Sequence, residues 1–263
     1  MMVRTRASRP SLARDGYALL PALLARDEVA ALAASVVDAG ARRDVAACER
    51  PNNTLVALRW DDPEVDAVLA DAARVARIRA ASDGTDLRWT SAYVSTMTAL
   101  AGPVPWHQDW WCWAHPVTRS VRAVQAVLLC YLRPTSTARG ALRLIPGSHL
   151  DGSGSAREVT VAARAGDAVL LDYRLRHGTH PNTSGERRDC LILNFAPSWR
   201  DLPDDIRAHL ARGFALPGAG ERGDARRCWS ALLPDHAGSP RDLPLSRGAP
   251  AAFAHRDAPY RRA

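Results

Sequence analysis

The stretch AVLLDYRLRHGTHPNTSGERRDCLILNF, residues 168–195, contains two apolar runs separated by a segment rich in turn residues. The runs AVLLDY (168–173) and CLILNF (190–195) have the length and the aliphatic content of buried β-strands. Between them, HPNTSGE (180–186) contains the Pro, Asn, Ser and Gly residues that favour turns. The stretch therefore predicts two β-strands joined by a loop.

Four similar apolar runs lie upstream of this pair. They are WTSAYVSTM (89–97), VQAVLLCYL (124–132), ALRLI (141–145) and EVTVAA (158–163). Several short strands in succession, with turn residues rather than helices between them, are typical of a β-sandwich or jelly-roll barrel and not of alternating βαβ units. The central part of the chain is therefore predicted to be a β-barrel.

The chain before these strands indicates helices instead. Apolar residues recur at helical spacing over residues 28–39. A second helix is expected to begin at Asp62 and Pro63, a cap followed by a first-turn proline, and to continue to the turn near Gly84. A short helix is also predicted within PDDIRAHLARGF (203–214), after the last strand.

Helices first and strands afterwards predict a mainly β, α+β chain. The expected core is a double-stranded β-helix, the jelly-roll or cupin-like fold, flanked by the N-terminal helices. A chain of 263 residues is consistent with one main domain. We expect that domain to span residues 14–216, between a flexible N-terminus (1–13) and a C-terminal tail or lid (217–263).

Composition excludes some classes of partner. The net charge is +7, but all 35 basic residues are arginines spread along the chain, without the clustered patch of a nucleic-acid-binding protein. No apolar run reaches the length of a membrane span or a signal peptide. The five cysteines lack metal-finger spacing and predict thiols in a reducing compartment. We expect a cytoplasmic protein that binds neither nucleic acid nor membrane; the sequence carries no signal for an oligomeric state.

A candidate metal site lies in PWHQDWWCWAH (105–115). His107 and Asp109 are one residue apart, and alternate side chains of a strand share one face, so both could reach the same ion. A mononuclear Fe(II) site of the facial-triad type needs such a pair and one more histidine. Taken alone, the pair is equally compatible with the polar edge of a strand.

A third ligand and a charged partner are available further along the chain. His177 follows the predicted strand 168–173, and Arg188 begins the last strand. Strands distant in sequence lie side by side in a barrel, so His177 could complete a triad with His107 and Asp109. The guanidinium of Arg188 suits bidentate binding of a carboxylate near the metal.

These motifs together resemble one known family. The matching blocks are RDGYALLPALLARDEVAAL (14–32), PWHQD (105–109), GALRLIPGSH (140–149) and AGDAVLLDYRLRHGTHPNTSGERRDCLILNF (165–195). In order and spacing they resemble the phytanoyl-CoA dioxygenase family of Fe(II)- and 2-oxoglutarate-dependent oxygenases. The likeness covers most of residues 14–198.

The resemblance implies a role for five residues. His107, Asp109 and His177 would be the catalytic iron ligands, and Arg188 would anchor the distal carboxylate of 2-oxoglutarate. Thr179 stands where the family often places a hydroxyl that contacts the same carboxylate. The implied cofactors are Fe(II), 2-oxoglutarate as co-substrate, and O2.

Two choices within these motifs stay open. His180 could replace His177 as ligand, although the family spacing to Arg188 favours His177. Arg187 would point to the opposite face of its strand from Arg188, and is the weaker candidate for the anchor.

The tryptophans near the HxD motif have two interpretations. If the strand continues, Trp111 and Trp113 share a face with the ligands and could line the substrate pocket. Otherwise these two residues fill the barrel core.

The implied activity is oxidation of a small molecule, by default hydroxylation of an unactivated C–H bond, as in bacterial specialised-metabolite biosynthesis. An oxidative cyclase, desaturase or epimerase of the same family is the nearer alternative. A non-catalytic, cupin-like metal-binding module is the more distant one; it has no need of Arg188.

Overall fold

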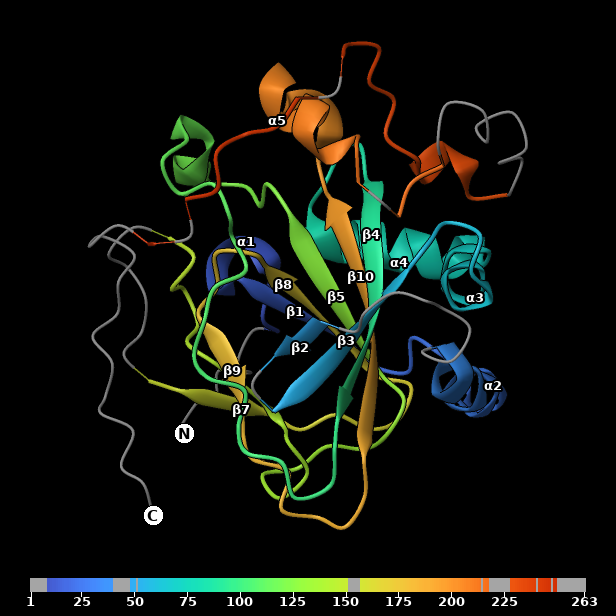
Figure 1. Cartoon of the computed structure of the whole chain (residues 1–263). Helices are drawn as coiled ribbons and strands as arrows, with labels where there is room; N and C mark the ends of the chain where they lie inside the picture. Colours follow the sequence, from blue (N-terminus) through green and yellow to red (C-terminus); the bar gives the residue numbers. More distant parts are fainter. Residues whose placement is uncertain are drawn as a thin grey trace, which may run out of the picture.

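The computed structural model describes residues 9–39, 48–50, 52–150, 157–213, 215–217, 228–239, 241–246 and 248–249. Two antiparallel sheets, one large and one small, form the centre of this part of the chain (Figure 1). Their inner faces share a hydrophobic cluster, in which Val127 and Leu171 of the large sheet pack with Leu142 and Leu144 of the small one. This arrangement confirms the predicted mainly β, jelly-roll class.

The large sheet has seven strands and the small sheet has three. In spatial order the large sheet consists of β1 (Tyr17–Leu20), β8 (Ala168–Asp172), β5 (Ala126–Tyr131), β10 (Arg188–Ala196), β4 (Arg88–Met97), β3 (Asn53–Leu58) and β2 (Cys48–Arg50). The small sheet consists of β7 (Val159–Val161), β6 (Leu142–Leu144) and β9 (His177–Thr179). Strands far apart in the sequence, such as β5 and β10, are direct neighbours.

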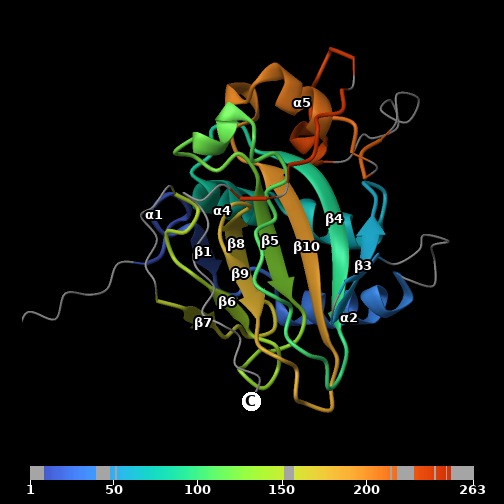
Figure 2. The same ribbon diagram turned by 60° about the vertical axis from the view of Figure 1, so that its left-hand side comes forward.

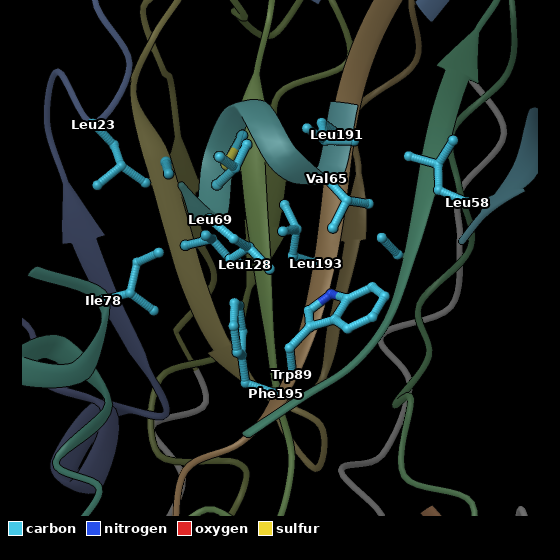
Figure 3. Close-up of a cluster of buried hydrophobic side chains, with 14 of the residues drawn as sticks. Leu23, Leu58, Val65, Leu69, Ile78, Trp89, Leu128, Leu191, Leu193 and Phe195 are labelled. Atoms are coloured by element: carbon cyan, nitrogen blue, oxygen red, sulfur yellow. The ribbon is translucent and has the colours of Figure 1, made fainter. Parts of the chain in front are cut away.

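Helices cover one face of the large sheet. They are α2 (Arg26–Ala39), α3 (Pro63–Leu69) and α4 (Ala72–Ser82), all three of which lie on the right of Figure 1. Figure 3 shows the interface, where Val65 and Leu69 of α3 lie against Leu128, Leu191 and Leu193 of the sheet. Because side chains alternate along a strand, the residues between these leucines point the other way, toward the small sheet.

The single helix expected between Asp62 and Gly84 is instead two helices, and the prediction is wrong on this point. The Asp71 carboxylate accepts a hydrogen bond from the Arg74 amide at 3.0 Å and so caps a new helix. The buried Arg74 guanidinium donates to the carbonyl of Ala67 at 2.6 Å, near the end of α3. These two interactions satisfy the backbone groups that the break exposes.

The six predicted strands are all present, whereas four observed strands were not expected from the sequence. These are β1, β2, β3 and β9, which span three to six residues each. Runs this short give little periodicity, and β9 (HGT) contains no apolar side chain. Their strand geometry comes from pairing with neighbours, as for β9, which pairs with β6.

The chain after β10 lies across one end of the barrel (Figures 1 and 2). It includes η2 (Trp199–Asp201), the predicted helix as α5 (Asp204–Leu210), and η3 (Ser230–Leu232). Two further elements are α1 (Leu12–Asp15) and η1 (Pro116–Arg119). The helix α1 begins within the N-terminal segment expected to be flexible; residues 1–8 of that segment and much of 217–263 lie outside the described residues. No helix in the described ranges has the length and apolar content needed to cross a membrane.

Candidate metal centre

Three side chains from two distant segments converge at one point inside the barrel. The candidate ligand atoms of His107, Asp109 and His177 all lie within 4.8 Å of one another. Asp109 sits between the imidazoles, with its Oδ1 3.6 Å from His107 Nε2 and its Oδ2 3.6 Å from His177 Nε2. The structure therefore brings together the three residues that the sequence proposes as iron ligands.

The backbone fixes the positions of the two histidines. His107 and His177 form an isolated antiparallel β-bridge, in which the backbone amide of each residue donates to the carbonyl of the other, at 2.8 and 3.0 Å. Directly opposed residues of an antiparallel pair hold their side chains close together, and the ring centroids are 4.2 Å apart. Backbone pairing between two segments seventy residues apart in the sequence thus brings two of the three candidate ligands together.

The same two histidines are also held in one tautomer. Nδ1 of His107 donates to the carbonyl of Pro105 at 2.8 Å, and Nδ1 of His177 donates to the carbonyl of Leu175 at 2.9 Å. A carbonyl can only accept, so Nδ1 carries the hydrogen and the Nε2 lone pair faces Asp109. An imidazole that donates its other N–H to a backbone carbonyl is the usual arrangement of a metal-bound histidine.

Asp109 does not lie on a continuing strand, contrary to the expectation for residues 107–113. After the bridge at His107, the Trp110 amide donates to the carbonyl of Tyr173 at 2.9 Å, and the segment turns across the end of β8. Gln108 donates from Nε2 to the carbonyl of Arg174 at 2.6 Å. These contacts on both sides of Asp109 hold its carboxylate in place.

The arrangement fits an Fe(II) ion. Two neutral imidazole nitrogens and one carboxylate, with open space on the remaining side, are the donor set of non-haem iron oxygenases. The open space is a cavity of about 450 Å³, and all three candidate ligands line it. A co-substrate and a substrate could therefore approach the metal from the same side.

Arg188 stands at another part of the same cavity. It begins β10, is 6% exposed, and donates from Nη1 to the carbonyl of Gly140 at 2.8 Å. Its Nε is buried without a hydrogen-bond partner among the described residues. A buried guanidinium nitrogen with no acceptor is costly, and the carboxylate of 2-oxoglutarate would supply one.

Two hydroxyl-bearing residues line the same cavity as Arg188. The Thr179 hydroxyl accepts a hydrogen bond from the Val104 amide at 2.9 Å, and Thr179 lines the cavity as expected. Tyr131 also lines it, a residue that the sequence analysis does not identify. Burial raises the pKa of Tyr131, so its hydroxyl remains a neutral hydrogen-bond donor at physiological pH.

The competing candidates point elsewhere. His180 Nε2 bonds the Thr160 hydroxyl at 2.8 Å, and His180 is not one of the clustered ligands. Arg187 forms an ion pair with Asp189 and its side chain is 39% exposed. The geometry thus favours His177 and Arg188 over their neighbours.

The tryptophans divide between the two interpretations. Both residues belong to the hydrophobic cluster that contains Trp110 and Trp199, but Trp111 also lines the cavity, whereas Trp113 does not. The expectation that Trp113 faces the pocket is therefore wrong. The reason is that the strand does not continue beyond His107, so the alternation of faces assumed for Trp113 does not apply.

Several residues of the cavity escape sequence analysis. Tyr93, Asn194, His209 and Leu245 line it together with the residues named above. Tyr93 of β4 pairs with Ile192 of β10, and Asn194 lies two residues further along β10. Both side chains therefore share the face of Ile192, which also lines the cavity, and this direction follows once the register is known. His209 on α5 and Leu245 in the C-terminal region come from segments whose position depends on tertiary packing, and no sequence signal identifies them.

Comparison with known proteins gives one family match. The family model described as Phytanoyl-CoA dioxygenase (PhyH) matches residues 12–190. A search of curated protein sequences gives no match.

Solved structures similar to the chain include an epimerase and a carbocyclase from nogalamycin biosynthesis. The epimerase SnoN, in complex with Fe3+, alpha ketoglutarate and nogalamycin RO, is 21% identical, with a TM-score of 0.57 over 70% of this chain and 80% of SnoN. AviO1 from Streptomyces viridochromogenes Tue57 is 28% identical, with a TM-score of 0.55 over 70% of this chain and 91% of AviO1. HygX from Streptomyces hygroscopicus, with nickel, 2-oxoglutarate and hygromycin B bound, is 18% identical, with a TM-score of 0.57 over 71% of this chain and 84% of HygX. For SnoN and HygX the likeness shows a shared fold.

Proposed function

Because the chain belongs to the phytanoyl-CoA dioxygenase family of Fe(II)- and 2-oxoglutarate-dependent oxygenases, we propose that it hydroxylates an unactivated C–H bond of a small molecule. The chain is accordingly a dioxygenase, an oxidoreductase whose cofactors are Fe(II), 2-oxoglutarate and O2. One observation carries the proposal: the three candidate ligands and the partly unpartnered Arg188 line a single cavity.

Each residue at the metal end has a separate task in this proposal. His107, Asp109 and His177 hold Fe(II) and leave the cavity side of the ion free. Arg188 binds the distal carboxylate of 2-oxoglutarate, and Thr179, which lines the same cavity, offers its hydroxyl to that carboxylate. When bound, Fe(II) with 2-oxoglutarate and O2 supplies the oxidising power to remove hydrogen from carbon. The chain's own contribution is to orient the substrate carbon and to exclude water.

The substrate we propose is a specialised metabolite of bacterial biosynthesis. Two structurally similar proteins support this assignment, since SnoN was solved with nogalamycin RO and HygX with hygromycin B. The volume of about 450 Å³ lies in the range of small-molecule sites. A small-molecule substrate therefore agrees with the volume of the cavity and with the compounds bound to SnoN and HygX.

A second outcome of the same chemistry is epimerisation or ring closure. SnoN, with which the chain shares its fold, is an epimerase, and a related structure, SnoK, is a carbocyclase. Removal of hydrogen from carbon can begin each of these reactions, so the three candidate iron ligands do not distinguish among them. A non-catalytic metal-binding module has less support, because it has no use for a buried arginine in the cavity.

We also propose that residues 14–216 form the catalytic domain and that part of 217–263 covers it. Leu245 lines the cavity, and the Ser246 amide donates to the carbonyl of Trp111 at 2.8 Å. These contacts support a covering role for this segment rather than that of a detached tail.

The test is conversion of 2-oxoglutarate to succinate by Fe(II)-loaded protein in air. Wild-type protein is expected to form succinate slowly without added substrate, and Asp109→Ala protein is expected to form none. With a candidate substrate and isotopically labelled O2, a product containing one labelled oxygen supports hydroxylation. A product without it supports epimerisation or ring closure, and the absence of any succinate would overturn the proposal.

A further inference from the structure

Beyond the iron ligands and the 2-oxoglutarate anchor, we propose that His209 is a substrate-binding residue whose subsite selects uncharged, oxygen-bearing ring compounds. This inference rests on the proposed function, because the compound binds next to the candidate metal centre. His209 lies on α5, outside both sheets, yet lines the same cavity as His107, Asp109 and His177.

The imidazole of His209 is held in one orientation. Its ring stacks on Trp111, with centroids 4.2 Å apart and planes inclined by 26°. The Leu243 amide donates to Nδ1 at 3.2 Å. Trp111 is itself fixed, since its Nε1 donates to the Gln125 side chain at 2.6 Å. The subsite is therefore preorganised, which lowers the entropic cost of binding.

The hydrogen bond from Leu243 also determines what the ring offers. Because Nδ1 accepts, the neutral imidazole carries its hydrogen on Nε2 and acts as a donor there. Burial lowers the pKa of His209 in spite of the opposing effects of the Asp242 carboxylate and of a hydrogen bond to the Arg241 backbone, and the lowered pKa favours the neutral form. His209 thus presents a hydrogen-bond donor without a charge.

An acceptor on the large sheet complements this donor. Asn194 of β10 lines the cavity, and its Nδ2 donates to the Ser91 hydroxyl at 2.8 Å. With its amide nitrogen so engaged, Asn194 offers its Oδ1 to a ligand. A donor and an acceptor in one cavity suit hydroxyl, ether or carbonyl groups on the substrate.

Apolar side chains also line the cavity. Leu129 and Ile192 line it from the sheet, and Leu245 lines it from the C-terminal region while remaining 60% exposed. An exposed leucine at the edge of a cavity gains contact area when a ligand covers it. A ring with an apolar face would bury this surface, so the subsite suits ring compounds.

The charges of the described lining residues disfavour an ionic substrate. Although the chain has 35 arginines, Arg188 is the one arginine among the described lining residues, and Asp109 is the one carboxylate. Both are assigned to the cofactors. Asp242, 3.8 Å from His209 Nδ1, is ion-paired with Arg212. Among the described lining residues, a phosphate, carboxylate or ammonium of the substrate would find no further charged partner, which is costly for a buried charge.

The test measures binding rather than turnover, with protein loaded with Ni(II) and 2-oxoglutarate. The probes are para-nitrophenyl glucoside, its sugar-phosphate derivative and its amino-sugar analogue, compared by saturation-transfer NMR. The uncharged glucoside is expected to bind at least about 10-fold more tightly than either charged relative, because a buried unpaired charge costs more than 1.4 kcal/mol.

The matched variants are His209→Phe and His180→Phe. Phenylalanine at 209 keeps the stack on Trp111 but removes the donor, so glucoside affinity is expected to fall roughly 5- to 10-fold, the value of one hydrogen bond. The same change at His180, which lies outside the cavity lining, is expected to have no effect. His209→Gln, which retains a donor, is expected to keep most of the affinity and serves if the phenylalanine variant does not fold.

The outcomes separate a failure of the inferred subsite from a failure of the proposed function. In every variant the visible absorption band formed by Fe(II) and 2-oxoglutarate without O2 is measured alongside binding. With a normal band, the inference is overturned if the glucoside does not bind, if a charged probe binds more tightly, or if His209→Phe binds as wild type does. An absent band in wild-type protein would contradict the proposed function instead.

Discussion

The two ends of the cavity are built in different ways. At the metal end, strand-like backbone pairing and carbonyl acceptors fix His107 and His177, and Arg188 is anchored at the start of β10. At the opposite rim, the lining comes from α5 and from the C-terminal region, through His209 and Leu245. The comparison teaches that the proposed cofactor-binding residues lie on the barrel, whereas the proposed substrate subsite combines barrel residues such as Asn194 with His209 and Leu245 from elements added to it.

Exposure follows this division only in part. His177 is 7% exposed and Arg188 is 6% exposed, whereas Leu245 is 60% exposed. The side chains of His107 and Asp109, at 31% and 24%, are however more exposed than that of His209, at 20%. Buried, hydrogen-bonded groups tolerate few substitutions, and exposed side chains tolerate many. We therefore expect variants at the metal end to abolish cofactor binding, and variants at the rim to change substrate preference without affecting the cofactors.

The largest effect is expected from removal of a ligand. Asp109→Ala should lower Fe(II) affinity by more than about 100-fold, because changes one step further from the metal already cost 10- to 100-fold. The affinity is measured by titration of the metal-free protein without O2. His177→Ala should behave alike, with His180→Ala as the matched control. If His180→Ala loses iron and His177→Ala retains it, the assignment of the third ligand is wrong.

The next effect concerns the 2-oxoglutarate anchor. Arg188→Ala should raise the 2-oxoglutarate Kd by roughly 30- to 100-fold, since a charge-assisted hydrogen bond contributes about 1.5–3 kcal/mol. Iron binding should be retained. Arg187→Ala, at the exposed neighbour, should leave the Kd unchanged. An unaltered Kd in Arg188→Ala would place the anchor elsewhere in the cavity.

A smaller effect at the metal end should follow from Gln108→Leu. This change removes the hydrogen bond to the carbonyl of Arg174 that holds the segment between the two ligands. Fe(II) affinity should fall by about 10-fold, the lower part of the range for groups that orient ligands. The control is Thr160→Val, which removes a hydrogen bond to His180 away from the cavity lining. Equal iron affinity in the two variants would show that Gln108 does not position the ligands.

The smallest effect on the cofactors is expected at the rim. Leu245→Ala should leave Fe(II) and 2-oxoglutarate affinities unchanged and alter the free energy of unfolding by less than about 0.5 kcal/mol, as for other exposed positions. Thermal unfolding and the two titrations measure this. A marked loss of iron affinity in Leu245→Ala would mean that the two ends of the cavity are not independent.

The metal end could be predicted from the sequence because its signals are local. His107 and Asp109 are one residue apart, and His177 and Arg188 flank a loop with recognisable turn residues. The apolar runs that form β4, β5, β8 and β10 are long enough to be read as strands. Fold class therefore follows from patterns within short stretches, and the candidate ligands follow from their spacing together with the resemblance to the phytanoyl-CoA dioxygenase family.

The rim could not be predicted because its residues acquire their place through tertiary packing. His209 lies on a short helix with no motif, and Leu245 is a single leucine in a Pro-, Gly- and Arg-rich region. The same cause explains the wrong placement of Trp113, since a hydrogen bond from the Trp110 amide to Tyr173 ends the strand geometry. The two-helix break at Asp71 likewise depends on the distant packing of Arg74.

The most direct test of the central claim is titration of metal-free protein with Fe(II) and then 2-oxoglutarate in the absence of O2. A weak metal-to-ligand charge-transfer band in the visible should appear in wild-type protein, be lost in Asp109→Ala, and need more 2-oxoglutarate in Arg188→Ala. A folded, iron-loaded wild-type protein that shows no such band would contradict the assignment of this cavity to Fe(II) and 2-oxoglutarate.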